Sequence, residues 1–112
     1  MTYVSASEEE DDGCVFCNAS RSNPSSDNLV LYKGKKALAM LNKYPYTNGH
    51  CMVAPRRHLA LYERLTPAEA AEIHQLSQRL IVILKKIYNP AGFNIGINIG
   101  RAGGAGIDGH LH

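Results

Sequence analysis

The sequence predicts an α+β domain in which one long helix covers an antiparallel sheet. Three observations support this fold class. Short runs with strand character, separated by turn residues, occupy residues 29–54; a single stretch with helical periodicity follows from residue 66; and an alternating run resumes at residue 93. With 112 residues, the chain is long enough for one domain with one modest core.

The N-terminal residues differ in charge from the rest of the chain. Residues 1–12 contain five of the ten acidic residues and no Lys or Arg, a composition typical of a disordered tail. We predict an acidic tail at residues 1–13 and a folded domain at residues 14–112. In that domain 12 Lys and Arg accompany only five acids, which suits an anionic ligand such as a phosphate ester. A solvated basic surface is the alternative for any single lysine.

Cys14 and Cys17 form a Cys-x-x-Cys pair, and two thiols at this spacing can bind one metal ion. A redox pair is the alternative, but it requires a strand before the motif and a helix after it. Residues 18–28 are instead rich in Ser, Asn, Pro and Asp, which predicts a loop. We therefore favour a metal site over a redox pair and over two unlinked buried cysteines.

Three strands are predicted next. Residues 29–33 and 36–42 form two of them, joined by a tight hairpin at Gly34-Lys35. After a loop that contains Pro45 and Gly49, residues 50–54 form the third, which is closed by Pro55.

The long helix has a clear start. Thr66-Pro67-Ala68-Glu69 is a capping box with proline at the first helical position, and the helix is predicted to run to about Tyr88. Residues at helical spacing form one apolar stripe, which should face the sheet: Ile73, Leu76, Leu80, Ile83, Leu84 and Ile87. His74 lies beside this stripe and is predicted to be an ordinary surface histidine.

The C-terminal residues carry the strongest functional signal. Strict alternation of apolar residues with Asn and Gly predicts a fourth strand at residues 93–99, and a glycine-rich stretch follows at residues 100–109. Such a loop can direct backbone N–H groups at an anion. His110 and His112 then alternate with Leu111, so both imidazoles should project to one side. Together these features suggest a nucleotide site; a glycine-rich hairpin with surface histidines is the alternative.

Two segments carry a resemblance to a known family. Residues 41–58 resemble the first signature of the histidine triad (HIT) superfamily, and residues 109–112 resemble the start of its second, in which histidines alternate with apolar residues. With Cys14 and Cys17, the resemblance covers roughly residues 14–112, and it is most similar to bacterial proteins related to diadenosine tetraphosphate phosphorylases. It implies a HIT-like antiparallel sheet whose last strand is truncated at His112, before a third triad histidine, and it implies a homodimer.

The resemblance assigns roles to individual residues. His112 corresponds to the nucleophile that attacks the α-phosphorus and forms a nucleotidyl-histidine, and His50 to the histidine packed beside it. Asn42 corresponds to the residue that binds the ribose hydroxyls, and Asn98 to one that contacts phosphate. The backbone N–H groups of the loop would bind the α-phosphate at Gly104, Ala105 and Gly106. Structural roles in the strands are the alternatives for His50, Asn42 and Asn98.

The resemblance also implies a structural zinc ion. In branches with Cys-x-x-Cys, two histidines complete the site, and they correspond to His58 and His110. A site with two Cys and two His ligands is closed, with no position left for substrate. In the alternative, His58 is a surface residue that caps a helix and His110 lines the substrate pocket.

We therefore expect a HIT-family hydrolase or phosphorylase that cleaves a dinucleoside polyphosphate or nucleoside phosphate conjugate at the α-phosphate. The alternatives are a catalytically inactive nucleotide- or RNA-binding module with a structural zinc, and a zinc-stabilised interaction domain. No apolar run approaches the roughly 20 residues that span a bilayer, and no secretory signal is visible. We expect a cytoplasmic protein with reduced thiols. Binding of extended nucleic acid is disfavoured, because basic and aromatic residues do not interleave.

Overall fold

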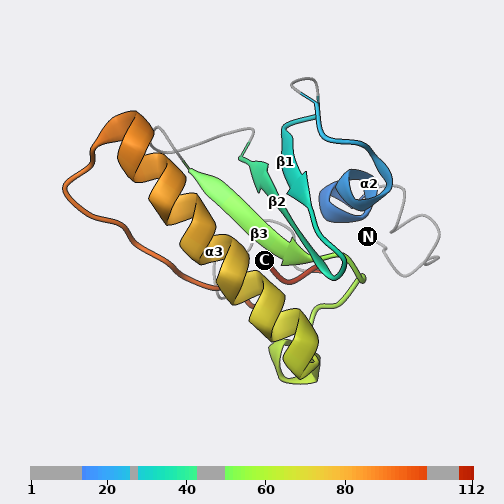
Figure 1. Ribbon diagram of the computed structural model, residues 1–112. Coiled ribbons are helices and arrows are strands. Elements are labelled where there is room, and N and C mark those ends of the chain that lie inside the picture. The colour runs from blue at the N-terminus through green and yellow to red at the C-terminus, as the bar shows by residue number, and fades with distance from the viewer. Residues whose placement is uncertain (1–13, 26–27, 43–49, 101–108) are drawn as a thin grey trace.

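A computed structural model describes residues 14–25, 28–42, 50–100 and 109–112. The predicted acidic tail at residues 1–13 and the predicted phosphate-binding residues 104–106 lie outside this range. The elements in chain order are α2 (Val15–Arg21), β1 (Val30–Lys33), β2 (Ala37–Leu41), β3 (Cys51–Pro55), the 3₁₀ turn η2 (Tyr62–Arg64) and α3 (Pro67–Tyr88). The sheet is antiparallel in the order β1-β2-β3, and α3 lies across it (Figure 1). This arrangement confirms the predicted α+β class.

The central strand β2 is buried on both faces. Leu38 and Met40 join the core cluster beneath α2, together with Phe16 and Ala54. Because alternate residues of a strand point to opposite faces, Ala37 and Ala39 belong to the other face, where α3 packs against β2 and β3. The sheet therefore separates two layers, with the short helix α2 on one side and the long helix α3 on the other.

The β1–β2 hairpin is fixed by a side chain from α3. The Glu72 carboxylate accepts hydrogen bonds from the backbone N–H groups of Lys36 and Ala37, both at 2.9 Å. A Cβ atom at position 34 would collide with this carboxylate, so a larger residue there would require the Glu72 side chain to shift. The hairpin itself lies where the sequence predicts it, within one residue at each strand end.

Helix α3 begins as predicted. Thr66 Oγ1 accepts from the Glu69 N–H at 3.1 Å, and Glu69 Oε1 accepts from the Thr66 N–H at 2.9 Å, so the capping box is formed. The predicted stripe is wrong at its end, because Ile83 and Ile87 are 49% and 64% exposed. A helix of 22 residues is about 33 Å long, whereas a strand of five residues spans about 17 Å. The C-terminal half of α3 thus extends beyond the sheet.

Two further sequence predictions, both of secondary structure, need correction. The loop predicted at residues 18–28 begins as the helix α2, because Cys14 caps its N-terminus and burial of Phe16 and Ala19 outweighs the weak helix propensity of Asn and Ser. The predicted fourth strand at residues 93–99 is wrong: these residues form no strand with the described part of the chain. Its alternating isoleucines are exposed, and its backbone contact within the described residues is the Asn98 N–H to the His112 carbonyl oxygen, at 2.8 Å. Alternation of apolar and polar residues indicates that one face could be buried, but a β-strand forms only when its backbone pairs with a neighbouring strand.

Candidate functional site

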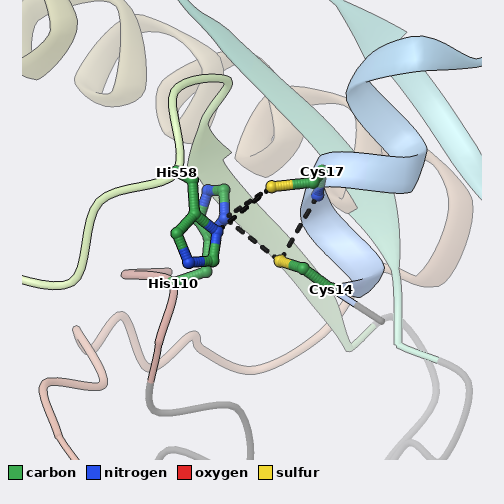
Figure 2. A group of neighbouring side chains, drawn as sticks. All are labelled: Cys14, Cys17, His58 and His110. Carbon is green, nitrogen blue, oxygen red and sulfur yellow. Dashed lines mark hydrogen bonds between the residues drawn. The ribbon is translucent and has the colours of Figure 1, made fainter. Parts of the chain in front are cut away.

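The four predicted metal ligands lie together between α2 and the end of β3 (Figure 2). The ligand atoms of Cys14, Cys17, His58 and His110 are all within 4.8 Å of one another. His110 Nδ1 is 3.3 Å from Cys14 Sγ and 3.7 Å from Cys17 Sγ, and His58 Nδ1 is 3.1 Å from Cys17 Sγ. Tetrahedral zinc, with bonds of 2.0–2.3 Å, requires ligand atoms about 3.5 Å apart. The donor set and its spacing therefore fit a zinc ion.

Helix α2 brings the two thiols to one place. Cys14 is its N-cap, and Cys14 Sγ accepts a hydrogen bond from the Cys17 N–H at 3.4 Å. Residues three apart share one face of a helix, so a single helical turn directs both sulfur atoms to the same point. The two side chains are only 5% and 6% exposed.

His110 is oriented by the end of β3. Its ring is 1% exposed, and Nε2 lies 2.8 Å from the carbonyl oxygen of Pro55. A carbonyl oxygen can only accept, so Nε2 carries the proton and the lone pair of Nδ1 faces the two sulfur atoms. Histidines that bind zinc commonly donate their second ring N–H in this way. The hydrogen bond thus selects the tautomer that a metal ligand needs.

The His112 ring is held by a similar hydrogen bond, but it lies away from the four clustered Cys and His residues. Its Nδ1 lies 3.1 Å from the carbonyl oxygen of His110, so Nδ1–H donates and the lone pair stays on Nε2. Phe16 packs against both imidazoles, with ring centroids 5.2 Å from that of His110 and 4.8 Å from that of His112. The two rings therefore share one side of the chain, as the alternation predicts, and Phe16 is a site residue that the sequence analysis did not identify.

His112 lines a groove of about 780 Å³ between β3, α3 and residues 92–98. Two other predicted residues, His50 and Asn98, line the same groove, and most of the remaining walls are apolar. Asn42 is next to His50: its Nδ2 is 3.4 Å from both ring nitrogens, and its backbone N–H donates to the His50 carbonyl oxygen at 3.1 Å. Of the predicted substrate residues, only Gly104, Ala105 and Gly106 lie outside the described chain.

Two charged contacts support the segment that carries His58. Arg57 donates two hydrogen bonds to Glu69, from Nε at 3.0 Å and from Nη2 at 2.9 Å. These bonds lower the pKa of the buried Glu69 carboxyl to about 2. The neighbouring Arg56 contacts Ser20 and Gly34. Sequence reasoning had no signal for these partners, because each pair is distant in the chain.

Comparisons with known proteins give consistent results. Residues 23–112 match the family model described as HIT domain. AP-4-A phosphorylase of Mycobacterium tuberculosis is 42% identical over 86 residues, which are 77% of this chain and 44% of that protein. The asymmetrical bis(5'-nucleosyl)-tetraphosphatase of Schizosaccharomyces pombe is 29% identical over 83 residues, 74% of this chain and 45% of its own length. The chain thus spans less than half the length of these relatives.

A solved structure is similar throughout the fold. The zinc-bound histidine triad family protein from Mycobacterium smegmatis superposes with a TM-score of 0.73 and is 26% identical, with 90% of this chain and 72% of that chain covered. Within the described part of the chain, no helix combines the length and apolar composition that a membrane span requires.

Proposed function

Because the chain belongs to the HIT domain family, we propose that it is a nucleotide-processing enzyme, a hydrolase or phosphorylase that cleaves a dinucleoside polyphosphate or nucleoside phosphate conjugate at the α-phosphate. The observation that carries this proposal is the orientation of His112. Its Nδ1–H is engaged by the His110 carbonyl oxygen, so the lone pair of Nε2 is available in the groove. The names of the mycobacterial and yeast relatives support the same substrate class.

The proposed reaction has two steps. First, His112 Nε2 attacks the α-phosphorus, a P–N bond forms, and the P–O bond to the departing phosphate chain breaks with its electron pair. Water or inorganic phosphate then attacks the same phosphorus and breaks the P–N bond, which frees the histidine. Splitting one difficult displacement in two is the usual advantage of a covalent intermediate. The Nδ1–H bond to a carbonyl stabilises the positive ring that forms in the first step.

Neighbouring residues support binding in the same groove. We infer that His50 and Asn98 contact the phosphate, since both line the groove with His112. Asn42, beside His50, would bind the ribose hydroxyls through its amide. The backbone N–H groups of residues 104–106 remain the proposed phosphate-binding loop.

The test uses the protein at its full natural length with diadenosine tetraphosphate. A hydrolase should produce AMP and ATP without inorganic phosphate. A phosphorylase should produce ADP, and only when phosphate is present. Protein denatured at alkaline pH, where a P–N bond to histidine survives, should carry label from a substrate labelled at the α-phosphate, and His112→Asn should carry none. Nucleotide binding without label in any reaction would instead support the inactive binding module.

We further propose that Cys14, Cys17, His58 and His110 bind a structural zinc ion. The spacing of the ligand atoms supports this, and so does the zinc-bound relative from Mycobacterium smegmatis. A zinc ion with four protein ligands has no open position, so it would stabilise the fold and take no part in the chemistry. Reduced thiols are needed to bind it, which supports the cytoplasmic location expected from the sequence.

We also propose a homodimer. The apolar residues that α3 and residues 93–99 leave exposed support it, among them Ile87 at 64% and Ile95 at 68% exposure. Contiguous apolar patches on a protein surface often mark interaction sites. Sedimentation of the wild type should give twice the mass of one chain, and Ile95→Asp should shift it toward the monomer. A monomeric wild type would refute the dimer.

A further inference from the structure

Arg56 joins three separate parts of the fold with one guanidinium group. Its Nε donates to Ser20 Oγ at 2.8 Å and its Nη2 to the Ser20 carbonyl oxygen at 3.1 Å, so one edge of the group contacts α2. Its Nη1 donates to the Gly34 carbonyl oxygen at 3.0 Å, in the β1–β2 turn. The backbone N–H of Arg56 continues the sheet by donating to the Lys36 carbonyl oxygen at 2.8 Å.

Three of the four proposed metal ligands come from two pieces of the chain that this residue connects, and the fourth, His110, comes from the C-terminal residues. Both thiols lie on α2, whereas His58 follows Arg56 by two residues. A helix of seven residues is not stable by itself, so its position depends entirely on tertiary contacts. Burial of Phe16 and Ala19 fixes which face of α2 meets the sheet. Apolar contacts are not directional, and they leave the position of the helix along its axis less well defined.

We propose that Arg56 is a positioning residue for the metal centre. It fixes the position of α2 along the helix axis, so that both thiols lie next to His58 and His110. This inference depends on the zinc site proposed above. The two bonds to Ser20 use one edge of the planar fork, and the third bond uses the remaining nitrogen. A lysine presents a single charged head and cannot reproduce this geometry.

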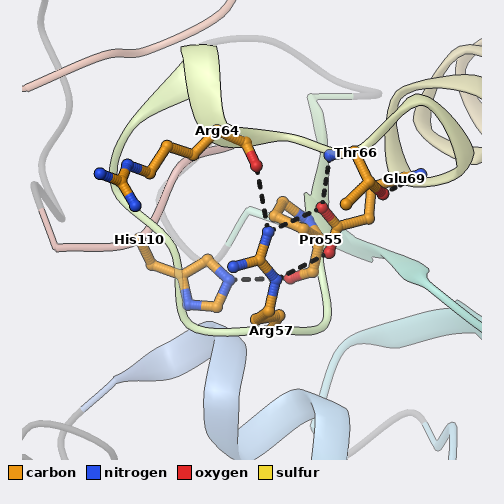
Figure 3. Close-up of polar contacts among 6 residues, drawn as sticks. All are labelled: Pro55, Arg57, Arg64, Thr66, Glu69 and His110. Atoms are coloured by element: carbon orange, nitrogen blue, oxygen red, sulfur yellow. Dashed lines mark hydrogen bonds and ion pairs between the residues drawn. The ribbon is translucent and has the colours of Figure 1, made fainter.

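The adjacent arginine provides a matched control within the same segment. Arg57 binds Glu69 through two hydrogen bonds and donates to the Arg64 carbonyl oxygen at 3.2 Å (Figure 3). These partners belong to α3 and to the turn before it, not to α2. Arg56 and Arg57 therefore secure the same segment to different elements, and only Arg56 reaches the helix that carries the thiols.

The experiment compares Arg56→Ala, Arg56→Lys and Arg57→Ala with the wild type. Zinc affinity is measured by competition with a chelating dye, and Co²⁺ is used as a spectroscopic probe because thiolate-to-cobalt charge-transfer bands report bound sulfur. We expect Arg56→Ala to lower zinc affinity about 10- to 100-fold and to weaken the sulfur bands. Arg56→Lys should recover only part of the loss, and Arg57→Ala should lower the affinity clearly less than Arg56→Ala does, because it leaves the contact with α2 intact.

Thermal unfolding of the metal-free variants separates positioning from general stability. If both alanine variants lose affinity in proportion to the stability they lose, or if Arg56→Ala binds zinc as tightly as the wild type, the inference is wrong while the zinc site stands. A wild type that binds no zinc would refute the zinc site itself. Should Arg56→Ala not fold, Ser20→Ala removes one of the three bonds, and we expect it to lower zinc affinity severalfold; unchanged affinity would again contradict the inference.

Discussion

The proposed metal centre and the groove use two histidines that are two residues apart, His110 and His112, but the two sites differ in how far they are enclosed by their own residues. At the proposed metal centre, Cys and His side chains from three parts of the chain converge in the interior, with His110 1% exposed and oriented by the Pro55 carbonyl oxygen. In the groove, His50 and His112 are half-buried, and apolar neighbours such as Ile95 face solvent. The buried cluster is enclosed by residues of this chain, whereas the groove is open to a ligand or to a second copy of the chain.

The difference suggests that His110 and His112, although close in sequence, have different roles. His110 faces the sulfur atoms and is locked by a buried hydrogen bond, whereas His112 extends past the Phe16 ring into the groove. A metal that fixes His110 would also limit the motion of His112, because the His110 carbonyl oxygen accepts the His112 Nδ1–H. Placement of a reactive group to within a fraction of an ångström has large effects on rate. The following predictions separate the two sites.

The largest expected effect is a loss of kcat on replacing His112, with no change in zinc binding. His112→Asn should lower kcat by at least about 10⁴-fold, since a nucleophile is removed. The zinc content should stay unchanged, because His112 is not among the four clustered donors. Steady-state kinetics and metal analysis on one preparation test both statements. A variant with much of its activity intact would show that another group attacks the phosphorus.

The next effect is on stability. With free zinc at about 1,000 times its dissociation constant, metal binding should stabilise the fold by about 4 kcal/mol, which a chelator should remove. The Cys17→Ser protein should not respond to the chelator, since it lacks a ligand. Urea unfolding with and without chelator measures the difference. Equal responses in both proteins would mean that zinc binds elsewhere.

A smaller effect concerns the contact between Arg57 and Glu69. The pKa of Glu69 is lowered from an ordinary value of 4.5 to about 2, mainly by the hydrogen bonds from Arg57. The unfolded chain therefore takes up this proton at a higher pH than the folded chain does. The contact stabilises fully above pH 4.5, and its contribution falls as the pH drops from 4.5 toward 2.

Because Arg57 is half exposed and solvent screens the ion pair, the contribution should be small. The stability of metal-free wild type relative to Glu69→Gln should decline by that small amount across this pH range, as measured by urea unfolding. A stability difference that stays constant with pH would exclude the linkage.

The parts of the fold that sequence predicts correctly depend on local signals. The capping box at Thr66 and the Gly34 hairpin are local, whereas the four Cys and His residues that lie together were chosen by residue type and family resemblance, and their binding of a metal stays a prediction. Helix α2 was missed because burial of Phe16 stabilises it more than its own propensity does. The strand at residues 93–99 was overpredicted because alternation cannot report pairing. The partners of Arg56 were invisible because Ser20 and Gly34 are distant in sequence.

X-ray absorption spectroscopy at the zinc edge tests the central claim most directly, because it reports the atoms bound to the metal. The four clustered residues predict one zinc ion per chain, bound by two sulfur atoms at about 2.3 Å and two imidazole nitrogens at about 2.0 Å. A first shell of oxygen and nitrogen alone, or one with four sulfur atoms, would contradict a metal centre made of Cys14, Cys17, His58 and His110.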